Sequence, residues 1–343
     1  QKIPYWIEQC NLSASDMAIF WIKVPFLKNN TNTTVYLYYG NPEASSESDG
    51  DAVFEFFDDF EDGVLGSQWE YRDGCSADDY YEESGGVGTI HVNYVDGCSS
   101  RLYQANYSDT PVLEGNLPNT DFELIVVYYN WNPPAGNPPY HDIGIDFVQD
   151  SDDFVGHLLS HSDWDNKYGR IRYKVDAGSS SKTDTARYTS DTQTYRYVKV
   201  IRTGDTYHFY YSTDGESWTD EGSETKAGLT KFALSVYVGS GNYSGSFDFI
   251  RIRKYASPEP SISSIGEEQV ITSTDSQGNY SYVFKAPSQP GEHIIKVNLT
   301  YEAYDEENET IFYVRGNLEI LTEGNITYEN PLVIQVNETG EIE

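Results

Sequence analysis

The chain has 343 residues, and its 22 Lys and Arg face 55 Asp and Glu, which gives a formal net charge of −33. This charge repels phosphate groups, so it excludes most nucleic-acid and anionic-membrane partners and leaves cation binding open. No apolar run approaches the roughly 18 residues of a transmembrane segment, and no signal segment stands at Gln1, so we expect a mature chain or a piece of one.

The composition favours strands, because 30 Tyr, 15 Phe and 6 Trp accompany abundant Thr, Val and Ile. Short alternating apolar runs recur, whereas no sustained helical stripe is found. We expect strands at residues 121–131, 142–148, 169–175, 195–202, 206–212, 232–238 and 246–255. About six to eight strands joined by hairpins predict a two-sheet antiparallel sandwich of the jelly-roll type.

Changes in composition predict the domain boundaries. Residues 1–55 form a partial N-terminal β-module, and VFEFFDDFEDG then begins the sandwich, which extends over residues 56–256. A stretch rich in Pro, Ser and Glu, residues 257–268, is the expected linker. Residues 269–315 suit an immunoglobulin-like module of three strands with turns at Pro-Ser-Gln-Pro-Gly and Asp-Glu-Glu-Asn, and residues 316–343 begin a further β-module.

The cysteines and the glycosylation sequons indicate in which cellular compartment the protein is located. Cys75 and Cys98 lie in a duplicated Asp-Gly-Cys-Ser tetrapeptide, so they form either a disulfide between neighbouring segments or two unpaired thiols, and Cys10 has no assigned partner. Asn-x-Ser/Thr sequons predict an extracellular glycoprotein, unless they reflect only an excess of Asn, Ser and Thr in turns. The sequons lie at Asn11, Asn32, Asn106, Asn242, Asn279, Asn298, Asn308, Asn325 and Asn337.

An acidic cluster marks the start of the predicted sandwich. The first and last strands of a jelly roll commonly lie side by side, which would bring Asp248 near Asp59. Oxygen ligands from a loop and a neighbouring strand suit Ca²⁺, and a solvated acidic turn is the alternative. The predicted calcium ligands are Asp59, Glu61, Asp62 and Asp248.

Two loops combine aromatic rings with polar groups, as carbohydrate sites do. The first loop provides Trp131, Tyr140 and Asp142, and the second provides Trp164 and Asn166. These five residues are the predicted glycan site, and the alternative is that both tryptophans pack on the sandwich as loop anchors.

His157 and His161 are four positions apart, which on a strand separates them by roughly 13 Å. No further metal-ligand motif accompanies them. We therefore expect surface or cleft polarity rather than a metal site.

Three stretches carry family resemblances. PYWIEQCN, AIFWIKVPFL and TVYLYYGNPEASSESDGDAVFEFFDDFE resemble the second half of the domain of unknown function 2341 family, which occurs in secreted and surface proteins of archaea and bacteria. DDFEDGVLGSQWE, RTGDTYHFYYSTDGESWTD and SFDFIRIRKYASPEP resemble concanavalin A-like lectin/glucanase sandwiches. DSQGNYSYVFKAPSQPGEHIIKV resembles bacterial-type immunoglobulin-like repeats.

Enzymes of the concanavalin A-like fold typically present Glu-x-Asp-x-x-Glu along one strand, and this spacing does not occur in the chain. The resemblances therefore imply a non-catalytic extracellular protein of cell-surface architecture or adhesion, with glycan binding by the lectin-like sandwich. One alternative is a filament or surface-layer subunit joined to neighbouring copies by strand exchange. A polysaccharide-active glycosidase is the second alternative.

Overall fold

A computed structural model gives the fold, and it describes residues 2–11, 17–27, 33–37, 45–74, 76, 78–93, 110–129, 140–162, 167–189, 194–261, 279–285, 291–301, 304–314 and 319–325. The chain divides into two compact units, Gln1–Pro260 and Ser261–Glu343. Among the described residues, no helix is long and apolar enough to cross a lipid bilayer.

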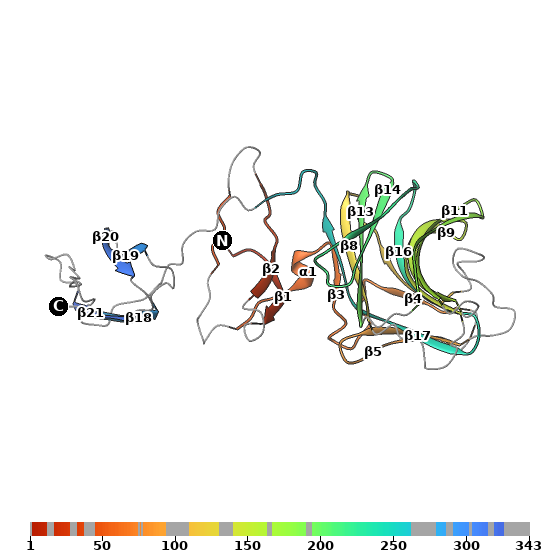
Figure 1. Cartoon of the computed structure of the whole chain (residues 1–343), viewed down its shortest axis with the longest axis horizontal. Helices are drawn as coiled ribbons and strands as arrows, with labels where there is room; N and C mark the ends of the chain where they lie inside the picture. The colour runs from red at the N-terminus through yellow and green to blue at the C-terminus, as the bar shows by residue number, and fades with distance from the viewer. Residues whose placement is uncertain are drawn as a thin grey trace. The chain divides into compact units, whose positions relative to one another are not determined.

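Two antiparallel sheets face each other in the first unit (Figure 1). The seven-stranded sheet has the spatial order β12 (Ser179–Tyr188), β11 (Lys167–Asp176), β10 (Asp153–Ser162), β9 (His141–Asp150), β16 (Lys231–Val238), β7 (Val112–Asn116) and β4 (Glu70–Arg72). The eight-stranded sheet has the order β15 (Thr219–Thr225), β14 (Thr206–Ser212), β13 (Tyr195–Thr203), β8 (Phe122–Tyr129), β17 (Asn242–Lys254), β6 (Gly88–Asn93) and β5 (Tyr80–Glu83), with β3 (Phe56–Asp58) also paired to β17.

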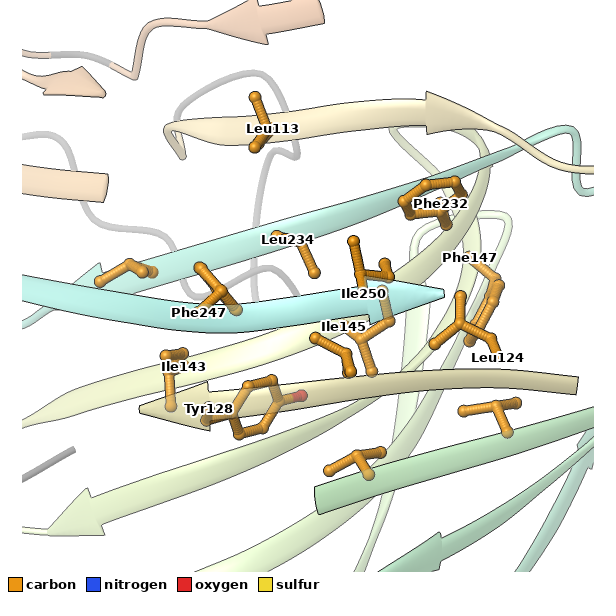
Figure 2. Packing of buried hydrophobic residues seen from close by; sticks show 14 of the residues in the cluster. Leu113, Leu124, Tyr128, Ile143, Ile145, Phe147, Phe232, Leu234, Phe247 and Ile250 are labelled. Atoms are coloured by element: carbon orange, nitrogen blue, oxygen red, sulfur yellow. The ribbon is translucent and has the colours of Figure 1, made fainter. Parts of the chain in front are cut away.

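The core between the sheets follows from side-chain alternation, because successive residues of a strand point to opposite faces. Leu124 and Tyr128 of β8 meet Ile143, Ile145 and Phe147 of β9 in one buried cluster (Figure 2). Figure 2 also shows Phe247 and Ile250 of β17 among these side chains. The prediction of a two-sheet sandwich is therefore confirmed.

The outer face of the seven-stranded sheet carries a second buried cluster. Its members alternate with the inter-sheet residues of the same strands, so they point away from the eight-stranded sheet. The cluster consists of Val112, Val148, Phe154, Leu158, Ile171, Tyr173, Val175 and Ala233. The central strands of this sheet are accordingly buried on both faces, and this burial includes polar residues such as Asp146 and His157.

The N-terminal segment forms a small layer of β1 (Tyr5–Asn11), β2 (Met17–Ile22) and α1 (Gly50–Val53). Asp49 caps α1, because its Oδ1 accepts a hydrogen bond from the Ala52 amide at 2.9 Å. The layer packs on the outer face of the eight-stranded sheet, where the Trp6 ring lies 4.9 Å from the Phe57 ring.

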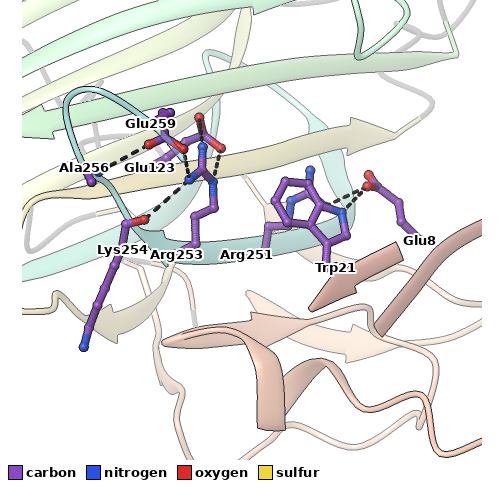
Figure 3. A network of polar contacts seen from close by, with 8 residues as sticks. All are labelled: Glu8, Trp21, Glu123, Arg251, Arg253, Lys254, Ala256 and Glu259. Carbon is purple, nitrogen blue, oxygen red and sulfur yellow. Dashed lines mark hydrogen bonds and ion pairs between the residues drawn. The ribbon is translucent and has the colours of Figure 1, made fainter. Parts of the chain in front are cut away.

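An ion pair joins this layer to β17. Arg251 donates to Glu8 at 2.9 Å, and its guanidinium carbon lies 4.1 Å from the centre of the Trp21 ring (Figure 3). Glu8 also accepts from the Trp21 indole at 2.6 Å. The neighbouring Arg253 binds Glu123 and Glu259, which fixes the chain where it leaves β17 (Figure 3).

The second unit contains two separate two-stranded antiparallel ladders among its described residues. One pairs β18 (Asn279–Lys285) with β21 (Glu319–Asn325), and the other pairs β19 (Gly291–Tyr301) with β20 (Tyr304–Val314). The predicted turn at Asp-Glu-Glu-Asn is wrong, because those residues lie inside β20 and the two strands meet at Tyr301 and Tyr304. Thr310, Ile311 and Phe312 continue the ladder beyond the acidic run.

Candidate functional site

The predicted glycan residues Tyr140 and Asp142 lie at one end of the seven-stranded sheet. Asp142 of β9 is paired with Ser160 of β10 on one side and with Tyr237 of β16 on the other. All three point to the outer face, since their neighbours along each strand fill the inter-sheet core. We call Tyr140, Asp142, Ser160 and Tyr237 the tyrosine rim.

Tyr140 closes the rim at the start of β9. Its hydroxyl is hydrogen-bonded to Ser160 Oγ at 2.5 Å, and its ring meets the Tyr237 ring edge to face at 6.2 Å. Both tyrosines are half-buried, whereas Asp142 is only 4% exposed. Ser160 is only 1% exposed, so the rim presents two half-buried aromatic rings to solvent and keeps Ser160 and Asp142 almost fully covered.

Several predicted site residues lie outside the described residues. Trp131, Trp164 and Asn166 of the predicted glycan site are among them. Cys75 and Cys98 are outside as well, so the choice between a disulfide and two thiols stays open. Tyr237 and Ser160 were missed by the sequence analysis, because strand register alone brings them to Asp142.

Asp146 lies further along β9 on the same outer face and is fully buried. Its Oδ2 accepts from Ser235 Oγ at 2.8 Å, while its Oδ1 has no hydrogen-bond partner among the residues that the structure describes. Burial raises the pKa of Asp146 to about 8, and the bond from Ser235 opposes this shift. Asp146 is therefore a largely neutral carboxyl group at neutral pH.

Asp142 and Asp146 do not form a hydrolytic pair. Four positions along a strand correspond to roughly 13 Å, whereas the two carboxyl groups of glycosidases lie about 5 to 9.5 Å apart. A fully buried Asp146 is also out of contact with solvent. Within the described residues, these two carboxyl groups therefore lack the spacing of a glycosidase pair.

His157 and His161 are fully buried between the sheets, so the expectation of surface or cleft polarity is wrong. His157 Nε2 is hydrogen-bonded to Glu221 of β15 at 2.5 Å, and Arg170 of β11 donates to the same carboxylate at 2.6 Å. Burial raises the pKa of Glu221, but the nearby His157 and Arg170 outweigh burial and hold it below its ordinary value. This buried network links the two sheets at one edge.

The predicted pairing of the first and last strands is confirmed, because β3 is paired with β17 and Asp58 lies opposite Ile250. The acidic residues that follow β3 therefore lie beside β17. Asp58 accepts from the Trp69 indole at 2.6 Å and from the Phe60 amide at 2.8 Å, so its oxygens serve the turn. Burial, together with the charges of Glu61 and Asp59, raises the pKa of Asp248 to about 6. The structure therefore brings Asp248 within electrostatic reach of both residues.

Calcium binding at Asp59, Glu61, Asp62 and Asp248 stays a prediction. Within the described part of the chain, no group of three or more His, Cys, Asp or Glu side chains has a geometry that could hold a metal ion. Asp59 and Asp62 instead accept from the backbone amides of Glu61 and Val64, two positions further on. These contacts are those of a solvated acidic turn.

The sequons fall on strands and on undescribed segments. Asn242 is exposed at the start of β17. Asn11, Asn279, Asn298, Asn308 and Asn325 lie in strands, and Asn32, Asn106 and Asn337 lie outside the described residues. Occupancy of the sequons stays a prediction.

Comparison with known proteins relates the chain to a domain family and to a fold. Residues 1–72 match the family model described as Domain of unknown function (DUF2341). The match extends through β3 to the end of β4, so it includes the first strand of each large sheet. No curated protein matches the chain in sequence.

Solved structures with a similar sandwich include several carbohydrate-active enzymes. The GH43 protein BlXynB from Bacillus licheniformis has 18% identity and a TM-score of 0.44, over 59% of this chain and 39% of that one. LamAcat from Zobellia galactanivorans has 11% identity and a TM-score of 0.41, over 60% and 100% of the two chains. The β-glucanase of Bacillus licheniformis has 11% identity and a TM-score of 0.39, over 58% and 98%.

These similarities concern the fold alone. The chain spans 39% of the length of the GH43 protein BlXynB, so the activity of that whole protein does not transfer. Two large antiparallel sheets with a shared core define a β-sandwich like the concanavalin A-like fold. What the sandwich binds has to be argued from its own side chains.

Proposed function

We propose that this chain is a non-catalytic part of an extracellular cell-surface protein and that its lectin-like sandwich binds glycans at the tyrosine rim. The observation that carries the proposal is the row of Ser160, Asp142 and Tyr237 across three neighbouring strands, with Tyr140 beside it. Aromatic rings contact the C–H faces of sugars, and the half-buried rings of Tyr140 and Tyr237 are the accessible groups of the rim. Ser160 and Asp142 are almost fully buried, and Ser160 is hydrogen-bonded to Tyr140.

The extracellular assignment is supported by the sequons and by the family resemblance of the N-terminal segment. In this proposal the second unit is an immunoglobulin-like spacer, whose two ladders supply antiparallel strands of the required kind. The net charge of −33 suits a protein kept soluble outside the cell.

Glycan binding is tested by titrating the chain against an array of neutral oligosaccharides and repeating the titration with variants. Tyr237→Ala removes one ring of the rim and should weaken binding about threefold to tenfold, since an aromatic contact contributes about 0.5 to 1.5 kcal/mol. Tyr140→Phe keeps the ring but removes the bond to Ser160 Oγ.

Tyr80→Ala is the matched control, because Tyr80 is an exposed tyrosine on β5 of the other sheet. Binding that is lost equally in Tyr80→Ala and Tyr237→Ala would contradict the assignment to the rim. Absence of glycan binding by a folded protein would remove the proposal itself.

A further inference from the structure

The outer face of the eight-stranded sheet carries an aromatic surface beside the N-terminal layer. That layer covers β3 and β17, where Trp6 and Trp21 pack on Phe57 and Arg251. The adjacent strands β8, β13 and β14 place further rings on the same outer face. We call the rings of Tyr129, Tyr195, Tyr197, Tyr210 and Trp218 the aromatic strip.

The strip follows from strand register. Tyr195 of β13 is paired with Tyr129 of β8, and their rings lie 5.3 Å apart. Lys199, paired with Tyr210 of β14, places its amine 4.0 Å from the centre of the Trp218 ring. Tyr195 and Lys199 are four positions apart, which gives the strip a length of roughly 13 Å.

The rings of the strip are accessible to a ligand. Tyr195 is 41% exposed, and Tyr197, Tyr210 and Trp218 are partly exposed. Tyr197 is supported from the side of the Asp214-Gly215 turn, because a Cβ at Gly215 would lie 3.2 Å from its ring. Partly exposed, supported rings in a line are a suitable platform for the faces of successive sugar units.

Asp248 adds an unusual charge next to this platform. The register of β17 against β8 shifts between Phe247 and Phe249, so Asp248 is the extra residue of a β-bulge. Phe247 points into the core and Phe249 contacts Trp6 on the outside, which places the bulged Asp248 on the outer face. β-bulges are a common device for re-aiming a functional side chain.

Asp248 has no cationic neighbour in the described part of the chain. No hydrogen bond or ion pair joins it to another described residue, although it is only partly exposed. The charges that raise its pKa, after burial, are those of Glu61 and Asp59, which are also negative. Asp248 lies between Ser246 and Phe249, whose β8 partners Tyr129 and Val127 are in turn paired with Tyr195 and Tyr197. The register therefore places Asp248 two strands from these rings, and its charge adds to burial in raising their pKa.

We propose that the aromatic strip and Asp248 form a second binding site, for a polysaccharide that carries free amino groups. The rings of Tyr195 and Tyr197 contact the sugar faces, and Asp248 pairs with a ligand ammonium group. Charge complementarity selects this ligand class, because anionic glycans are repelled by Asp248, Asp59 and Glu61. A neutral glycan offers Asp248 only hydroxyl donors, whereas an ammonium group also supplies the opposite charge.

The test uses two probes with the same backbone: a hexamer of β-1,4-linked glucosamine and its fully N-acetylated counterpart. Binding to the whole chain is measured by calorimetry in buffer with chelator, so that calcium does not compete at Asp248. The free-amine hexamer should bind at least about tenfold more tightly, because a hydrogen bond to a charged group contributes about 1.5 to 3 kcal/mol.

Two variants and two controls locate the site. Asp248→Asn should abolish the preference for the free amine, while Tyr195→Ala should weaken both hexamers. Tyr80→Ala is the control for loss of an exposed tyrosine elsewhere on the same sheet. Tyr237→Ala removes a ring of the tyrosine rim, so retained binding of the glucosamine hexamer in this variant separates this site from that of the proposed function.

Equal binding of the two hexamers, or an unchanged preference in Asp248→Asn, would overturn the role of Asp248. Failure of both hexamers to bind would overturn the site as a whole. Tighter binding of a lysine-rich peptide than of the glucosamine hexamer, with the same dependence on Asp248, would assign the strip to a basic protein partner and refute the glycan proposal. Far-ultraviolet circular dichroism of each variant confirms that it is folded.

Discussion

Replacement of Asp146 by Asn should make the sandwich more stable, and increasingly so as the pH rises. The carboxyl group is fully buried, and its folded pKa of about 8 lies well above the value of about 3.9 of an unfolded Asp. Below the unfolded pKa, the carboxyl group is protonated in both states and the folded protein keeps its full stability. Between the two pKa values, the unfolded chain ionises while the folded carboxyl group stays protonated, so the folded state loses stability as the pH rises, until the pH passes the folded pKa. Between these limits, each pH unit therefore costs the wild type about 1.4 kcal/mol.

From pH 5 to pH 8 the expected loss at this one group amounts to about 4 kcal/mol. Asparagine keeps an oxygen that can accept from Ser235 Oγ and does not ionise, so this slope should be absent in Asp146→Asn. The unfolding free energies of both proteins are measured in urea at several pH values across this window. The contributions of all other titrating groups cancel when the two unfolding free energies are subtracted, because both proteins contain these groups.

The difference in unfolding free energy between Asp146→Asn and wild type should grow by about 4 kcal/mol from pH 5 to pH 8. Parallel stability curves would refute the reasoning, because they would mean that Asp146 ionises in the folded state as easily as in the unfolded chain. A difference that grows toward low pH would reverse the sign and equally exclude a buried neutral carboxyl group.

Three further substitutions probe packing and strain, each measured by urea denaturation. Glu8→Gln removes the charge that faces the buried Arg251, so it should lower the unfolding free energy by about 1 to 3 kcal/mol. Glu47→Gln, at an exposed ion pair, should change it by no more than about 0.5 kcal/mol. Equal effects of the two substitutions would contradict a buried contact between Glu8 and Arg251. Gly156→Ala would place a Cβ 2.3 Å from Asp146 Oδ1 and 2.5 Å from the Tyr173 hydroxyl, so it should cost about 1 to 3 kcal/mol; an unchanged midpoint would mean that both groups can move aside. Ala177 has a φ of 48° in an exposed turn, so Ala177→Gly should raise the unfolding free energy by up to about 1 kcal/mol. The same change at Ala186 within β12 should lower it. A lower unfolding free energy for Ala177→Gly would contradict backbone strain at this position.

The sequence predicts most central strands, but it misses the central β10 as well as the edge strands. β8 and β9 are found within a few residues of the expected ranges, because their runs of Ile, Val and Phe fill a buried sheet. β12 was not predicted, since SSSKTDTARY lacks an alternating apolar pattern and its side chains are mostly exposed. The sandwich therefore has more strands than the six to eight expected, and the extra ones include the polar edges.

The positions of candidate site residues were predictable where loop composition or topology places them, and their role as a site stays a prediction. Tyr140 and Asp142 were expected from the aromatic and polar composition of their loop, and Asp248 was expected near Asp59 from the pairing of first and last strands. No local signal links Ser160 or Tyr237 to Asp142, because strand register decides that contact. The bulge that directs Asp248 outward likewise has no signature in the sequence SFDFIRI.

The distribution of charge supports the proposal of a cationic ligand at Asp248. Its basic side chains are few, and several of the arginines are engaged inside the fold: Arg251 with Glu8, Arg170 with Glu221, and Arg253 with Glu123. These pairs neutralise acids within the structure and leave little positive charge to balance the acidic surface, since the net charge is −33. An external cation therefore meets carboxylates, such as that of Asp248, that have no internal partner among the described residues. Binding that depends on them must weaken as salt screens the field, over a distance of about 8 Å at physiological ionic strength.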